Sequence, residues 1–589
     1  MLLIDALKTA GYGNWHVMYY TVTIPLLAIC CAHIYLNITI AYSPLHRCRT
    51  PPGAKWTDFI RKIDVTADNK SMYASCDMYK FHAVNGSYKI SKTLQSCSDH
   101  FEYMEDTSDF ALTEDAKPIS RRFGPTLSQK LNVTCNHVFS SAFPGLSSVA
   151  IWPFQPLSLP FMDKLGRKSV LCVTLSLSGI ILAITPYVAT YWNMWVIRCL
   201  QRIFIQIAYL ALTRHIVELH PIDERHCTIA LTVTGYAAGL PFLILLDWLF
   251  SSNWRKVVYA LAMSTLIWTP VVILFFPESP LFWVVNVNRE KEADSVVGRI
   301  ARWNAVKLPL DFCVEPSPLL TNSLTRTPPR WQGYLIRSWT KIMYNPFIFR
   351  RWLYVTLTWF VVNYIWVSVS ITRAVYPFSL RWNFAIIGVM AMLGGVLTQM
   401  LLRFFKKMEI IVAFLFSGST GFLVDAYVMP TEGLGLSRMT TSYTIRSTSY
   451  CVTAMTTLSM LGILRLQSAE IRGEECQPGA IFWMILCATT GGAVGMYYVK
   501  LVEIAPMYTP LLSGLATVLT AVAILIWFND IDFMEDCRWR PQMKDCFCRK
   551  RRPIMPLIRR HVLDLFHAHQ RANHLHPVHG ISVTSSAGT

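Results

Sequence analysis

The sequence predicts an all-α membrane protein with twelve transmembrane helices in two bundles of six. Hydrophobic residues make up 53% of the 589-residue chain and charged residues only 15%, whereas about a quarter of a soluble globular chain is charged. The mean hydropathy is +0.35. Twelve mainly apolar stretches approach the length of about 20 residues that crosses the hydrocarbon as a helix. These observations exclude an ordinary soluble domain.

The apolar stretches divide the chain into two similar halves. They cover 18–41, 143–162, 169–189, 194–217, 228–250, 257–276, 352–371, 384–402, 410–429, 443–466, 480–499 and 510–528. The first is too long for a signal-peptide core and lacks a cleavage site of small residues, so we expect it to be retained. The predicted parts are an N-terminus 1–17, a first bundle 18–277 with a large loop 43–142, a central loop 278–349, a second bundle 350–529 and a tail 530–589.

Basic residues in the short loops predict the orientation. Lys164, Arg167 and Lys168 lie between the second and third stretches, and Arg403, Lys406 and Lys407 lie between the eighth and ninth. Cytoplasmic loops carry an excess of Lys and Arg, so both termini are expected in the cytoplasm. The net charge of +18 then reflects membrane topology and a basic tail beside anionic lipid, and no nucleic-acid partner is expected.

The large loop 43–142 has the chemistry of an extracellular segment. It contains four cysteines and two glycosylation sequons, at Cys48, Cys76, Cys97, Cys135, Asn85 and Asn132. An even number of cysteines in an oxidising compartment predicts disulfides, and the sequons predict glycosylation. Four cysteines allow three pairings, which all stay open. A third sequon, at Asn37, lies inside the first apolar stretch and is expected to be unmodified.

Several short motifs resemble solute carrier family 22, the organic cation, anion and zwitterion transporters of the major facilitator superfamily. They are SPLHRC at 43–48, DKLGRK at 163–168, ELHPIDER at 218–225, PESPLFW at 277–283 and NPFIFRRWLYV at 345–355. PESP also occurs in sugar porters, but those lack the first of these motifs and the long cysteine-bearing loop. The resemblance implies the major facilitator fold, transport of small organic ions by alternating access, and a multi-pass protein of the plasma membrane.

The second half departs from the family pattern. Its turn, LRFFKKM, keeps Arg403, Lys406 and Lys407 but lacks the Asp and the Gly. Glu470 keeps the place of a family glutamate, yet Gln477 stands where the family has Arg. These losses leave an alternative open, a non-transporting membrane receptor or scaffold derived from such a carrier.

The resemblance implies a gate of charged residues. Its expected members are Asp163, Arg167, Lys168, Glu218, Arg225 and Glu278 in the first half, and Arg403, Lys406 and Glu470 in the second. Exposed ion pairs contribute only about 0–1 kcal/mol each, which suits contacts that form and break during a transport cycle. The alternative is a basic loop that only fixes topology.

The substrate site is expected between the two halves near the membrane midplane. Arg202 and Gln206 share one helix face, and Arg202 is expected to face a cavity or an acidic partner such as Asp247 or Asp425. Trp359, Asn363 and Trp366 share a face of another helix, where aromatic rings suit organic solutes. Thr489 stands where the family's cation transporters carry Asp and its anion transporters Arg. Structural pairing and ordinary helix packing are the alternatives.

No other chemistry is predicted from the sequence. It shows no hydrolase or kinase constellation, so we expect no enzyme, no cofactor and no metal site. The segment HAHQRANHLHPVHG at 567–580 is rich in histidine but is interpreted as a polar tail. The expected partners are a small organic solute and the lipid bilayer, and the sequence predicts no oligomeric state.

Overall fold

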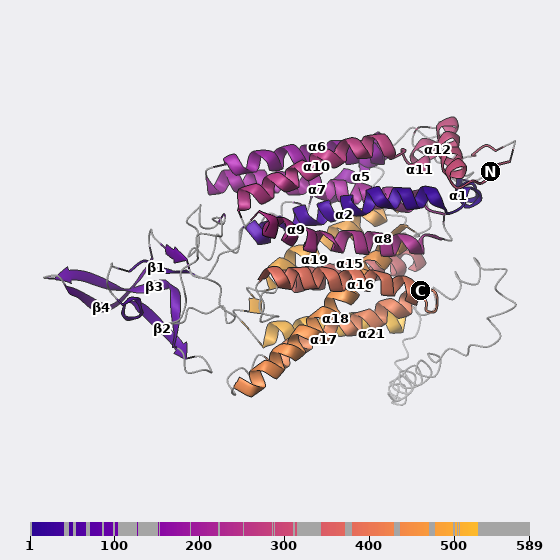
Figure 1. Ribbon diagram of the computed structural model, residues 1–589. Helices are drawn as coiled ribbons and strands as arrows, with labels where there is room; N and C mark the ends of the chain where they lie inside the picture. The colour runs from indigo at the N-terminus through magenta and orange to yellow at the C-terminus, as the bar shows by residue number, and fades with distance from the viewer. Residues whose placement is uncertain are drawn as a thin grey trace, which may run out of the picture. The chain divides into compact units, whose positions relative to one another are not determined.

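The computed structural model is drawn in Figure 1. It describes residues 3–40, 46–50, 55–65, 71–84, 87–97, 101–103, 127, 151, 153–188, 190–221, 224–250, 253–285, 287, 289–309, 312–314, 343–344, 346–371, 380–428, 436–469, 477–498, 501–502, 505 and 507–527. All the sites discussed below lie within one compact unit, Met1–Ala521.

In the first half, the described parts of the predicted spans are mainly helical, while residues 143–150 of the second span lie outside the described residues. The helices of this half are α1 Leu3–Ala10, α2 Asn14–Ile40, α5 Phe154–Leu165, α6 Arg167–Ile184, α7 Tyr191–Glu218, α8 His226–Ala237, α9 Gly239–Leu249, α10 Trp254–Phe275, α11 Pro280–Val285 and α12 Glu290–Trp303. One predicted span, 228–250, divides at Ala238 into α8 and α9. Pro241 has no N–H to donate to the Ala237 carbonyl, so one bond of the helical ladder is missing there.

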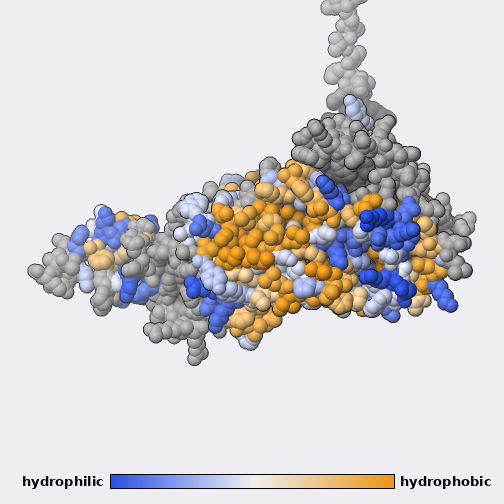
Figure 2. Space-filling view, turned by 90° about the horizontal axis from the view of Figure 1, so that it is seen from above, coloured by the Kyte–Doolittle hydropathy of each residue, from blue (hydrophilic) through white to orange (hydrophobic). Residues whose placement is uncertain are grey.

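Six more helices lie in the described residues of the second half. They are α15 Pro346–Ile371, α16 Leu380–Leu401, α17 Lys407–Val428, α18 Leu436–Ala469, α19 Gln477–Met496 and α21 Tyr508–Trp527. Nine candidate spans in the described part of the chain are long and apolar enough to cross a membrane, and Ile481–Met496 is a shorter apolar helix. The multi-pass membrane architecture is therefore confirmed, whereas the count of twelve spans stays a prediction. Figure 2 shows an apolar face between hydrophilic patches, as a bilayer-embedded surface requires.

The two halves meet where α16 packs against α8 and α9. Gly388 of α16 permits this close approach, because a Cβ built there would lie 2.5 Å from Cδ of Pro241. Within the first half, α2 packs against α7, α8, α9 and α10, and within the second half α15 packs against α18 and α19. A space enclosed between the halves is therefore bordered by helices from both.

The large loop departs from the all-α prediction, because it contains strands. β2 Ile60–Val65, β3 Ser71–Val84 and β4 Ser87–Ser96 form an antiparallel sheet in the order β2-β3-β4, and β1 His46–Cys48 pairs with β5 Phe101–Tyr103. Alternating residues such as those of SYKISKTL in β4 favour a half-buried strand. This pattern lies outside the apolar stretches on which the prediction of helices depends.

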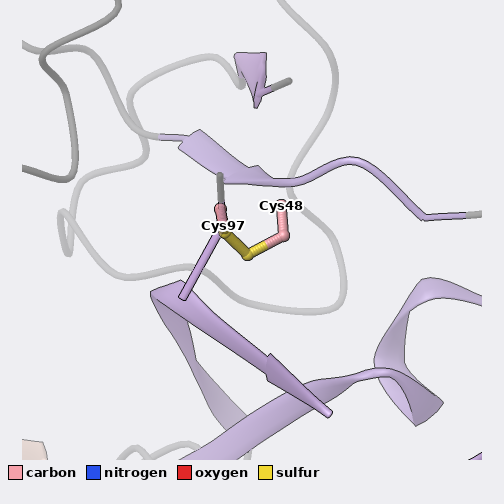
Figure 3. The surroundings of a disulfide bond; sticks show 2 residues. All are labelled: Cys48 and Cys97. Carbon is pink, nitrogen blue, oxygen red and sulfur yellow. A yellow bond between two sulfur atoms is a disulfide. The ribbon is translucent and has the colours of Figure 1, made fainter. Parts of the chain in front are cut away.

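A disulfide joins Cys48 of β1 to Cys97, which follows β4 (Figure 3). It closes a loop with a sequence separation of 49 residues, which corresponds to about 4 kcal/mol of stabilisation on the chain-entropy model. Of the other predicted sites, Cys76 lies in β3, while Asn85, Asn132 and Cys135 lie outside the described residues. The structure thus selects one of the pairings that the sequence left open.

We expect the loop to be glycosylated at Asn85 and Asn132 and to contain a second disulfide, between Cys76 and Cys135. Peptide-N-glycosidase should increase the gel mobility of protein from the cell surface, and replacing both asparagines with Gln should remove that change. Asn37→Gln is the control, because Asn37 is buried in α2. Unchanged mobility, together with free thiols at Cys76 and Cys135 in peptide mapping, would contradict the assignment.

Candidate functional site

A cavity of about 280 Å³ lies between the two halves. It is bordered by residues of α2, α5, α7, α8 and α11 from the first half and of α15, α18 and α19 from the second. All six residues that the sequence suggested for a substrate site line it: Arg202, Gln206, Trp359, Asn363, Trp366 and Thr489. The structure therefore brings together side chains from three helices that are distant in sequence.

The charges on the cavity wall are mainly positive. Arg202, Arg214, Arg225 and Arg465 line it, and Glu218 is the one acidic residue among the described lining residues. Arg214 lies 3.8 Å from Glu218 through its Nε, and Arg167 lies 3.0 Å from the same carboxylate. The single carboxylate is thus engaged by two guanidinium groups, and the cavity has an excess of positive charge.

Arg202 and Arg198 share a helix face in the sequence but have different surroundings in the structure. Arg198 is fully buried, and its Nε donates a hydrogen bond of 2.7 Å to Oδ1 of Asn37 in α2. Arg202, one turn further along α7, borders the cavity. Asp425, which the sequence offered as its partner, lies 2.5 Å from Nε of Arg446 and accepts a hydrogen bond from Tyr450. Arg198 is therefore held by a neighbouring helix, whereas Arg202, also buried, forms part of the cavity wall.

Arg465 is a cavity residue that the sequence reading missed. It lies on α18, and its guanidinium carbon is 4.8 Å from the centre of the Tyr209 ring. The rings of Tyr209 and Tyr236 are 4.9 Å apart. The available signal was an arginine inside an apolar stretch, which is a functional candidate by default.

The remaining predicted residues give the cavity an aromatic and neutral wall. The ring of Trp366 meets Tyr35 of α2 edge to face, with centroids 6.5 Å apart. The Asn363 amide donates to the Trp359 carbonyl at 2.8 Å, and the Thr489 hydroxyl donates within α19 to the carbonyls of Leu486 and Ile485. Neither polar group carries a charge, so the arginines dominate the electrostatics of the site.

A second cluster of charges forms around Arg167 at the start of α6. The Arg167 side chain is 4% exposed and lies 3.2 Å from Asp163 and 3.0 Å from Glu218. Arg214 approaches Asp163 to 3.3 Å, and the Ser279 hydroxyl donates to Glu218 at 2.6 Å. The cluster ties α5, α6 and α7 to the segment after α10, and all its members belong to the first half.

Glu278 lies beside this cluster, where its charge acts on the Arg167 guanidinium and its carboxylate also binds the backbone. Its Oε1 accepts hydrogen bonds from the backbone N–H groups of Arg167 at 2.9 Å and Lys168 at 3.0 Å. It therefore caps the N-terminus of α6, where a carboxylate is favourable. Gly166 has a φ of +92°, and a Cβ there would lie 2.5 Å from Oε2 of Glu278. The glycine of the DKLGRK turn is thus required by both backbone conformation and space.

The other predicted gate residues are Arg225, Arg403, Lys406 and Glu470. Arg225 lines the cavity, and Glu470 lies outside the described residues. In the second-half turn Arg403 and Lys406 are exposed, and Glu409 accepts a bond of 3.2 Å from the backbone N–H of Lys406. That turn therefore caps its helix with its own glutamate, in the manner of a capping box. Arg214, Ser279 and Glu409 were missed. The i, i+4 spacing of Arg214 and Glu218 and the i, i+3 spacing of Lys406 and Glu409 could have indicated two of them, whereas Ser279 has no such signal.

Comparisons with known proteins support the fold described above. The family model described as Major Facilitator Superfamily matches residues 123–496. The β-alanine transporter of Drosophila melanogaster is 22% identical over 495 residues, covering 79% of this chain and 77% of that protein. The human organic cation/carnitine transporter 2 is 21% identical, covering 60% of this chain and 63% of that protein. The proton:xylose symporter XylE matches with a TM-score of 0.51 and 14% identity, covering 66% of this chain and 85% of that one.

We expect Arg167→Ala to destabilise the protein much more than Lys406→Ala. Removing Arg167 leaves the buried Glu218 carboxylate with less compensation, and breaking a buried pair costs about 3–5 kcal/mol. Lys406 is exposed, and such surface changes usually stay within about 0.5 kcal/mol. Thermal unfolding of detergent-solubilised protein measures the difference. Equal melting temperatures for the two variants would show that the Arg167 cluster contributes nothing to stability.

Proposed function

The chain belongs to the major facilitator superfamily, as a divergent relative of solute carrier family 22, and we propose that it transports small organic anions or zwitterions by alternating access. It is a membrane transporter of small solutes, not an enzyme. The charge preference is the new element of the proposal. It rests on the composition of the cavity wall.

The excess of arginine in the cavity favours the binding of a solute that carries a carboxylate. Arg202 and Arg465 approach the cavity from opposite halves, on α7 and α18. A guanidinium group binds a carboxylate through two parallel hydrogen bonds, and in a site of low dielectric it attracts an anion more strongly than in water. A simple cation would meet the same charges unfavourably.

The aromatic residues of the cavity wall favour binding of an organic solute, and they are compatible with the ammonium group of a zwitterion. The faces of Trp and Tyr rings attract an ammonium group by about 0.5–2 kcal/mol. Tyr35, Trp359 and Trp366 supply such rings on the same cavity. β-Alanine and carnitine, which appear in the names of two relatives, each carry a carboxylate and a cationic nitrogen. Solutes of this kind match both the arginines and the rings.

The cavity also supports alternating access. Along α7 its lining residues run from Arg202 to Glu218, a distance of about 24 Å at ~1.5 Å per residue. One end of the cavity therefore lies at the Arg167 cluster. We assign this end to the cytoplasm, with both chain termini, because the basic short loops lie there. In this proposal the cluster keeps the α5–α6 turn rigid, and the turn docks against α19 when the inner gate closes.

The alternative, a receptor or scaffold without transport, is not favoured. It rested on the altered second-half turn, Gln477 and Thr489. The second-half turn has its own cap at Glu409, and the cavity retains charged and aromatic residues from both halves. A plasma-membrane location remains part of the proposal, since it rests on the family resemblance and the large loop.

Uptake into cells or proteoliposomes tests the charge preference. We expect labelled β-alanine or carnitine to be transported better than the permanent cation tetraethylammonium. Arg202→Gln and Arg465→Gln should each raise the KM for the zwitterion about tenfold or more, because a hydrogen bond to a charged group contributes about 1.5–3 kcal/mol. Arg255→Gln is the matched control, since Arg255 is exposed and does not line the cavity.

Efficient tetraethylammonium uptake that is unaffected by Arg202→Gln and Arg465→Gln would refute the preference. Absence of saturable uptake across anions, zwitterions and cations, from protein present at the cell surface, would instead favour the receptor or scaffold.

The gate hypothesis predicts an asymmetry between the two turns. Asp163→Asn removes an anion that faces both Arg167 and Arg214, so it should shift the protein toward the inward-facing state and slow net transport. Lys406→Ala and Glu470→Gln should have smaller effects. Accessibility of single engineered cysteines from each side of the membrane, measured with surface expression, reports the shift. Equal shifts from the two turns would contradict the asymmetry, and no shift from either would leave the first turn as a topology signal only.

A further inference from the structure

We propose that Glu224, His226 and Cys227 form a binding site for a divalent metal ion of the zinc class. The three residues lie in the segment from the end of the α7–α8 connection to the first turn of α8. Their ligand atoms all lie within 4.8 Å of one another, and all three side chains are partly buried. The sequence analysis predicted no metal site, because a spacing of Glu-x-His-Cys matches no common zinc motif.

The distances between the three ligand atoms fit one face of a tetrahedral site. Sγ of Cys227 lies 3.6 Å from Nε2 of His226 and 3.7 Å from Oε2 of Glu224. The remaining edge, from His226 Nε2 to Glu224 Oε2, is 3.9 Å. Zinc bonds of about 2.0–2.3 Å at the tetrahedral angle place a nitrogen and an oxygen ligand about 3.3–3.4 Å apart and a sulfur and a nitrogen or oxygen ligand about 3.5–3.6 Å apart. Movements of a few tenths of an ångström would therefore complete the face.

The ligand types select the class of metal. A thiolate and an imidazole favour zinc and similar transition metals, whereas calcium and magnesium require oxygen ligands. A thiolate and a carboxylate together balance the charge of a divalent ion. The side chains of Glu224 and His226 are 42% and 33% exposed, so an ion can enter from solvent and keep a water in its fourth position.

The surroundings limit the site to these three residues among those described. His220 is close in sequence, but its Nε2 is bonded to the Tyr20 hydroxyl at 2.6 Å and its Nδ1 to the Ile216 carbonyl at 2.6 Å. Tyr12 and Arg403 also interact electrostatically with Cys227. Arg403 brings a positive charge from the second half, which the two anionic ligands offset.

The site lies at the contact between the two halves. Nε2 of Gln399 in α16 donates a hydrogen bond of 3.5 Å to Sγ of Cys227 in α8. A metal-bound thiolate accepts a stronger hydrogen bond than a neutral thiol, because a charged acceptor roughly doubles the strength. If the protein transports by rocking its halves, as proposed above, bound metal would hold α8 against α16 and slow transport.

Site-specific alkylation tests the metal site without relying on transport. The purified full-length protein would react with N-ethylmaleimide with and without ZnCl2, and mass spectrometry would quantify modification of the peptide that contains Cys227. We expect zinc to slow modification of Cys227 and not of Cys313, which is an exposed internal control. His226→Ala and the conservative Glu224→Gln should each weaken the protection at least about tenfold in zinc concentration, since loss even of outer partners costs about 10–100-fold in affinity.

No protection of Cys227 in the folded wild-type protein would overturn the site, as would equal protection in both variants. The readout concerns one peptide, so metal bound by other cysteines or histidines of the chain does not affect it. Zinc inhibition of uptake that is lost in Cys227→Ser would support the link to transport. Protection of Cys227 without inhibition of measurable uptake would overturn that link alone, and a protein with no uptake would contradict the proposed function while leaving the metal site supported.

Discussion

A guanidinium group inside a membrane protein must find its partners within the protein, and the positions of the arginines organise this structure. A central arginine facing lipid costs about 2.5–3.5 kcal/mol even on insertion scales. Arg198 meets Asn37, Arg446 meets Asp425, and Arg167 lies between two carboxylates. Each contact joins two helices, so satisfying the charge also fixes the packing. The helices α7 and α18, which carry Arg198 and Arg446, are thereby stabilised inside the bundle.

The arginines divide into those that are paired with a neighbouring helix and those that border the cavity. Arg198 and Arg446 are buried against partners that neutralise or solvate them, away from the described cavity wall. Arg202 and Arg465 border the cavity instead, from different halves of the chain. A cavity whose positive groups face a solute from both halves can couple binding to the relative movement of the halves. This is the physical link between the charge preference and alternating access.

The connection between α7 and α8 joins the proposed gate to the proposed metal site. Glu218 ends α7 within the Arg167 cluster, and Cys227 begins α8 in contact with Gln399. Between them, Arg225 borders the cavity. An ion-paired carboxylate, the proposed metal ligands and part of the cavity wall therefore lie within ten residues of chain. A movement of this segment would affect all three at once, which makes it the natural place for control of the transport cycle.

The sequence by itself determined the membrane class, the approximate limits of the helices and the family. Apolar length is a local property, and motifs such as DKLGRK fix backbone features, including the Gly166 turn, that depend on adjacent residues. Periodicity also predicted that Arg202 and Gln206, and Trp359 and Trp366, share helix faces. Only the tertiary structure decided what those faces contact. Arg198 contacts α2, whereas Arg202 and Arg465 line the cavity. The structure also decided that Cys48 pairs with Cys97. Glu278 and Arg167 are more than a hundred residues apart, and no local pattern specifies a contact at that separation, because it arises only when helices pack.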